Sequence, residues 1–160
     1  MSDQMQAILR RGDVLVWEDG TIIDVDSLDA YTEEARLIAH PLDSASIRTP
    51  DWVIDALNDA SRWAARMVAI IATAEEIKRQ KSAELADARA QAVIDTAGFP
   101  TREQASRVRL RTVAEREAYD RAVVAFEKAR RVGNLLSDYT SRLQSIGKQI
   151  EITYRNGGMS

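Results

Sequence analysis

The most constraining feature of this sequence is an apolar residue that recurs at alternating steps of four and three, without a gap, from Ala118 to Ile150. Steps that average about 3.5 residues place such side chains on one narrow face of a long α-helix. That face has to be covered by another helix, from the same chain or from another copy. We call it the seam; it consists of Ala118, Ala122, Ala125, Ala129, Val132, Leu136, Tyr139, Leu143, Ile146 and Ile150.

A second long helix is predicted before the seam. Thr49 can cap its start, Pro50 suits a first helical turn, and Asp51 complements the positive end of the helix. No proline interrupts the stretch that follows, so we predict a helix over about residues 51–96. This helix carries a shorter four-and-three pattern of its own, at Trp63, Met67, Ile70, Ala74 and Ile77.

The chain is expected to turn back between these helices, because Gly98 and Pro100 both stop a helix. The pairs Thr101/Gln104 and Thr112/Glu115 have the spacing of capping boxes. They predict a short helix at about 102–110 and a long one at about 113–154, which would be roughly 60 Å long. The fold class is therefore mainly α, a long antiparallel helical hairpin or coiled coil with a small N-terminal β-hairpin.

The two halves of the seam differ in bulk, since it starts with four alanines and ends with large side chains. We expect the alanine half to lie against the helix at 51–96 and the bulky half to join subunits. Further apolar residues lie off the seam, which also favours a ring or bundle of identical chains. The predicted oligomerisation residues are Val132, Leu136, Tyr139, Leu143, Ile146 and Ile150.

An acidic region, residues 1–48, is predicted to precede the hairpin region, residues 49–160. The first dozen residues are expected to form a short helix. Two β-branched runs, 14–17 and 21–25, flank Asp19-Gly20 and predict a β-hairpin. A short helix capped by Asp26 or Ser27 is expected over residues 27–38.

Charge is unevenly distributed, although the net charge is only −3. Residues 1–59 hold four basic and thirteen acidic side chains, whereas residues 101–160 hold twelve basic and seven acidic ones. Two interpretations stand open: a local basic face contacts phosphates, or the acidic and basic parts meet within the fold or across subunits.

Catalytic and metal-binding motifs are absent from the sequence. There is no cysteine, and the single histidine, His40, precedes Pro41 in an expected loop. Asp24, Asp26 and Asp29 do not match a calcium loop, and neither a phosphate loop nor a dinucleotide fingerprint occurs. We therefore expect no enzyme activity, no cofactor and no metal. No apolar run suits a membrane span or a signal peptide, so a cytoplasmic protein is expected.

Basic residues near the predicted turn are the candidate DNA-binding residues, because cationic side chains there could contact a phosphate backbone. The offsets between Lys78, Lys81 and Arg89 would place these three on one helix face. Ordinary solvated helix charge is the competing interpretation, since acidic residues are interleaved. The set is Lys78, Arg79, Lys81, Arg89, Arg102, Arg107, Arg109 and Arg111.

The order of these elements resembles the UvsY-like recombination mediators of tailed phages. The similar stretches run over most of the chain: residues 23–28, an alanine-rich helix, residues 100–103, 113–119, 135–136 and 143–146. The resemblance implies a homo-oligomeric ring that binds single-stranded DNA, contacts a single-strand-binding protein and helps to load a RecA-like recombinase. It also implies a lysine-x-arginine DNA contact, in which Arg89 fits the arginine but Asp87 replaces the lysine.

A recombination mediator in the cytoplasm of a phage-infected host is therefore the expected function. The alternative is a coiled-coil interaction protein without nucleic-acid binding: a virion or scaffold component, or an inhibitor of a host system that presents its acidic region.

Overall fold

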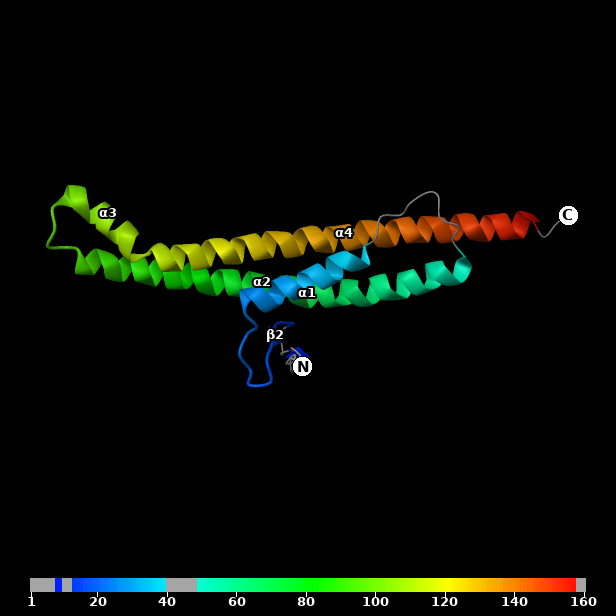
Figure 1. Ribbon diagram of the computed structural model, residues 1–160, viewed down its shortest axis with the longest axis horizontal. Helices are drawn as coiled ribbons and strands as arrows, with labels where there is room; N and C mark the ends of the chain where they lie inside the picture. The colour runs from blue at the N-terminus through cyan, green and yellow to red at the C-terminus, as the bar shows by residue number, and fades with distance from the viewer. Residues whose placement is uncertain (1–7, 10–12, 40–48, 158–160) are drawn as a thin grey trace.

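The computed structural model describes residues 8–9, 13–39 and 49–157, and two long antiparallel helices dominate it (Figure 1). Helix α2 spans Pro50–Asp95 and helix α4 spans Val113–Gly157, with the short helix α3, Thr101–Arg111, between them. The predicted bounds of these three helices hold to within three residues. The prediction of a mainly α helical hairpin is confirmed.

Helix α2 begins as its sequence predicts. The Thr49 side chain accepts a hydrogen bond from the backbone N–H of Trp52 at 3.2 Å, and Pro50 occupies the first turn. The two predicted capping boxes are wrong. Thr101 is already helical and no side chain caps α3, whereas the Thr112 hydroxyl donates back to the carbonyl of Val108 at 3.1 Å. Thr112 thus uses its hydroxyl for a bond to the carbonyl four residues earlier, which threonine can make in place of a forward cap.

The seam of α4 is covered by the same chain. Ala122, Ala125, Ala129, Val132 and Leu136 are buried in one core cluster with α2 residues that include Met67, Ile70, Ala74 and Ile77. Tyr139 and Leu143 form a second cluster with Ala60. The structure buries Val132, Leu136 and Tyr139 within the chain, and also Leu143, whereas the sequence pattern predicted that these side chains join subunits. Ile146 and Ile150 are half-buried near the end of the hairpin.

Helix α1, Val25–Ile38, supplies the additional cover, because it packs against both long helices near the middle of the hairpin (Figure 1). Leu28 and Ala35 are buried in the same cluster as the seam. The cap of α1 is Asp24, whose carboxylate accepts from the N–H of Ser27 at 2.6 Å, and not Asp26 or Ser27 as predicted. The hairpin is thus three helices thick at its centre.

Ion pairs join α1 to α4, so the acidic and basic parts of the chain do meet within the fold. Asp26 contacts Arg121 at 2.6 Å, and Lys128 contacts Asp29 at 2.7 Å and Glu33 at 2.6 Å. Hydrogen bonds from Lys128 and then Arg36 lower the pKa of Glu33. The hydrogen bonds that Lys128 donates to Asp29 and then to Glu33 raise the pKa of Lys128.

The N-terminal strands pair differently from the predicted hairpin. Strand β1, Ile8–Leu9, pairs antiparallel with β2, Leu15–Val16, so the expected N-terminal helix is wrong at residues 8–9; residues 1–7 and 10–12 lie outside the described part. The Asp19-Gly20 turn does form, with Gly20 at φ +83°. Its second arm is reduced to one bridge between Val16 and Ile22. Ile23 is buried in the helical core, which draws the chain away from the strand.

Candidate nucleic-acid interface

One end of the hairpin carries helix α3, which we call the tip together with residues 96–100 (Figure 1). No residue of α3 is buried, and all four of its arginines are exposed to solvent. It holds four arginines and one acidic residue, Glu103. The four candidate DNA-binding residues of the tip are Arg102, Arg107, Arg109 and Arg111.

Two of these arginines hold the tip together. Arg111 contacts Asp95 at 2.8 Å, which ties the end of α3 to the end of α2. Arg107 contacts Glu103 at 3.1 Å, and its guanidinium lies 3.8 Å from the ring centroid of Phe99. This distance is that of a cation–π contact, so Phe99 is engaged by an arginine of its own tip.

The other two tip arginines form no ion pair within the described part of the chain. Arg102 and Arg109 are exposed, and neither forms an ion pair with a residue that the structure describes. The first lies in the first turn of α3 and the second near its end. They are the tip cations most available to an external anion.

A hollow of about 320 Å³ lies between α2 and α4, in the half of the hairpin next to the tip, and adds a second cationic group. Arg89 projects from α2, while Arg116 and Tyr119 project from α4. Its remaining walls are Ser82, Leu85, Ala86 and Asp120. The hollow is thus lined by two guanidinium groups, one phenol ring and the single carboxylate of Asp120, so its lining keeps a net positive charge.

The sequence prediction named Arg89 but missed Arg116 and Tyr119. Their spacing of three residues places them on one face of α4. The sequence alone does not reveal the register of α4 against α2, and it is this register that brings Arg116 and Tyr119 to the same hollow as Arg89.

The other three candidate cations are dispersed along α2. Lys78 lies 3.8 Å from the centroid of the Phe126 ring. Arg79 contacts Glu76 at 3.1 Å, and Lys81 contacts Glu84 at 2.7 Å. These local contacts compensate part of their charge.

The structure does not bring Lys78, Lys81 and Arg89 together as one cationic group. Lys81 lines a separate hollow, whose walls include Asp24 and Asp26, whereas Arg89 lines the hollow with Arg116. The expected common face therefore does not form a common site.

The aspartates of the N-terminal region have structural roles in the described chain. Asp24 caps α1, and Asp26 and Asp29 form ion pairs with α4. No group of three or more potential metal ligands occurs among residues 8–9, 13–39 and 49–157, and His40 lies outside these ranges. None of the described helices combines the length and the apolar character that crossing a membrane requires.

Comparisons with protein-family models, curated protein sequences and solved structures gave no significant match.

Proposed function

We propose that the protein binds single-stranded DNA with the tip and the neighbouring hollow. The observation that carries the proposal is the convergence of Arg89, Arg116 and Tyr119 on one hollow beside a helix with four arginines. The planar fork of a guanidinium group suits phosphate oxygens. A tyrosine ring offers a stacking surface for an unpaired base.

A single strand fits this arrangement better than a duplex does. In a duplex the bases are already stacked on one another, so the ring of Tyr119 would gain nothing from them. Proteins that bind single strands commonly combine a cationic path with aromatic platforms. The hollow supplies one platform, and Arg102 and Arg109 extend the cationic path onto the tip.

The biological role we propose is that of a recombination mediator, which assists loading of a RecA-like recombinase on single-stranded DNA. The support for this role is the resemblance of the layout to the UvsY-like mediators. Contacts with the recombinase and with a single-strand-binding protein are part of the same proposal. The readout is the rate of recombinase filament formation on DNA coated with the single-strand-binding protein.

The test of DNA binding is fluorescence anisotropy of a labelled single-stranded oligonucleotide, with the full chain in low salt. The double variant Arg89→Glu/Arg116→Glu is expected to bind at least about tenfold more weakly, because two phosphate contacts are replaced by repulsion. The matched control is Arg62→Glu/Arg142→Glu, two exposed arginines outside the tip and the hollow, with an expected change below about twofold. Equal losses in both double variants, or no binding by the wild type, would overturn the proposal.

Tyr119 allows a second comparison. Tyr119→Phe keeps the ring and is expected to bind as the wild type does, whereas Tyr119→Ala is expected to lose roughly 1–3 kcal/mol of binding free energy. Identical binding by both variants would remove the stacking part of the proposal and leave the phosphate contacts.

A second candidate function is an interaction or scaffold protein that assembles through the end of the hairpin opposite the tip. The observation that favours it is the set of exposed apolar side chains on both helices there: Trp52, Ile54, Ile152 and Tyr154. Light scattering should find an oligomer for the wild type, a smaller species for Ile152→Asp, and an unchanged oligomer for Val68→Asp, an exposed position in the middle of α2. A monomeric wild type would exclude self-assembly.

A charged residue at a buried position of the seam, such as Leu143→Asp, would not test self-assembly. Leu143 is fully buried within the chain, so a charge there would unfold the hairpin whether or not subunits assemble.

A further inference from the structure

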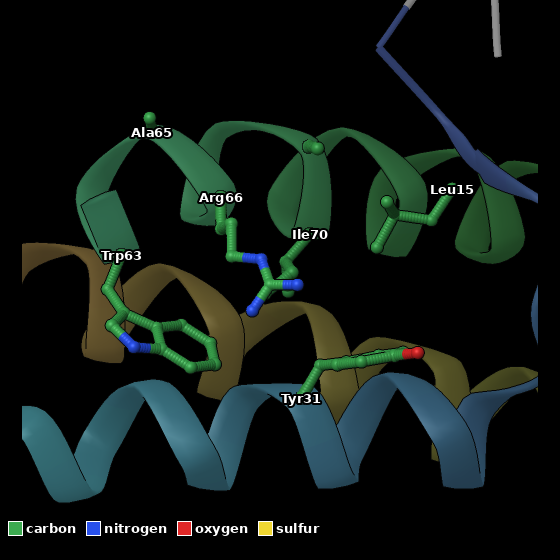
Figure 2. Close-up of a pocket in the computed structure, with 7 residues that line it drawn as sticks. Leu15, Tyr31, Trp63, Ala65, Arg66 and Ile70 are labelled. Carbon is green, nitrogen blue, oxygen red and sulfur yellow. The ribbon is translucent and has the colours of Figure 1, made fainter. Parts of the chain in front are cut away.

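A pocket with a volume of about 340 Å³ lies beside α1, near the middle of the hairpin and away from the tip (Figure 1). Figure 2 shows its lining residues in close-up. Its walls come from three elements: Tyr31 from α1, Leu15 from β2, and the remaining residues from α2. The α2 residues are Trp63, Ala65, Arg66, Ala69 and Ile70. Most of these side chains are apolar, and two are aromatic.

Arg66 supplies the only charge among these lining residues. Its guanidinium carbon lies 5.0 Å from the centroid of the Trp63 ring, which is within the range of a cation–π contact. Figure 2 shows the guanidinium group between the side chains of Trp63 and Tyr31, directed from α2 toward α1. The guanidinium group of this exposed residue is therefore held at the wall of the pocket by an aromatic neighbour.

The hydrogen-bonding capacity of Arg66 is not used by this contact. A guanidinium group carries five N–H donors in its plane, and a cation–π contact engages its charge without accepting these hydrogens. No hydrogen bond or ion pair joins Arg66 to a residue that the structure describes. Its N–H donors therefore have no protein partner among the described residues, at the wall of an apolar, aromatic pocket.

We propose that this pocket binds a flat aromatic ring that bears an anionic group, either a phosphate or a carboxylate. The anionic group pairs with the edge of the Arg66 guanidinium. The ring lies against the aromatic and aliphatic walls formed by Trp63, Tyr31 and Ile70. A pocket of this volume is at the small end of the range for ligand sites, roughly 300–1,000 Å³, so it accommodates one ring system and one acidic group.

Both parts of the ligand are needed for binding. An inorganic anion alone would have to displace water from Arg66 without burying any apolar surface, and an uncharged ring alone would gain no charge-assisted hydrogen bond from the guanidinium. A nucleotide and a free aromatic acid share the required chemistry. The pocket is separate from the tip and the hollow, so the proposal does not depend on the proposed function.

The test is isothermal titration of the full chain with four probes: thymidine 5′-monophosphate, thymidine, inorganic phosphate and 3-phenylpropionate. At least one of the two aromatic anions is expected to bind, and thymidine and phosphate to bind at least about tenfold more weakly. Binding of the nucleotide alone identifies a nucleotide site, and binding of both aromatic anions identifies a site for aromatic acids. No binding of either aromatic anion at millimolar concentration overturns the proposal.

Arg66→Gln tests the role assigned to the guanidinium group. It is expected to weaken binding of the aromatic anion at least about tenfold, as one charge-assisted pair is lost. Arg62→Gln, an exposed position one turn earlier on α2, is the matched control and should leave binding unchanged. Both residues are exposed, so circular dichroism should show that both variants fold. Equal binding by Arg66→Gln and the wild type would contradict the assignment.

Discussion

The hydroxyl of Thr73 in α2 accepts a hydrogen bond from the backbone N–H of Leu15 in β2, at 2.8 Å and across 58 residues of sequence. The same hydroxyl donates to the carbonyl of Ala69 at 2.6 Å, so both its donor and its acceptor roles are used. Thr73 is fully buried. This one side chain therefore fixes the N-terminal strands on the long hairpin and places Leu15 in the wall of the central pocket.

Thr73→Val is expected to destabilise the fold by about 1–3 kcal/mol, because a shape-conserving change leaves the Leu15 N–H without its acceptor. Hydrogen exchange at Leu15 should accelerate more than exchange in α2. Thr140→Val is the matched control, since the Thr140 hydroxyl donates only to Leu136 within its own helix. If both substitutions lowered the free energy of unfolding equally in urea denaturation, the bond between Leu15 and Thr73 would add no more stability than a threonine bond within one helix.

Neighbouring leucines of α4 test whether the seam is an intrachain core. Leu136 is fully buried, and Leu135 beside it is 42% exposed. We expect Leu136→Ala to reduce the free energy of unfolding by about 2–5 kcal/mol, and Leu135→Ala by less than about 1 kcal/mol. Denaturation at several protein concentrations checks this: a loss that depends on concentration would place Leu136 between subunits.

The contact between α1 and α4 should depend on pH at both extremes. Because the pKa of Glu33 is lowered in the folded chain, ionised Glu33 adds to the free energy of unfolding above the ordinary glutamate pKa. This stabilisation is lost as the pH falls through the lowered pKa. Because the pKa of Lys128 is raised, protonated Lys128 adds to the free energy of unfolding below the ordinary lysine pKa, about 10.4. This stabilisation is lost as the pH rises through the raised pKa. Stability should therefore change little near neutral pH.

Lys128→Met tests the cause of these shifts. It removes the donor that Glu33 and Asp29 share, so the pKa of Glu33 should rise toward its ordinary value in an NMR titration. Lys148→Met, an exposed lysine of the same helix, is the control. An unchanged Glu33 titration in Lys128→Met would assign the shift to Arg36 instead.

The long helices were predictable because their signals are local. Thr49-Pro50 marks the start of α2, Gly98 and Pro100 mark the turn, and the four-and-three spacing marks the buried face of α4. Spacing shows that a face is buried, but it does not identify what covers it. The cover is α1 and α2 of the same chain, and this depends on contacts over about a hundred residues, such as Lys128 with Asp29.

The candidate site was predictable only in part for the same reason. Sequence identifies which residues are basic, but the three-dimensional neighbours decide which charges are compensated. Lys81 and Arg111 have carboxylate partners, whereas Arg102 and Arg109 have none among the described residues. Arg116 faces the same hollow as Arg89 only because of the register between α4 and α2.

The most direct test of the central claim is the salt dependence of binding to a single-stranded oligonucleotide. If Arg89, Arg116 and the free tip arginines contact about two to four phosphates, the logarithm of the association constant should fall against the logarithm of the salt concentration with a slope between about −1.4 and −2.8. Arg89→Gln/Arg116→Gln should make this slope less steep by about 1.4. A slope near zero for the wild type, or the same slope for both proteins, would contradict the account.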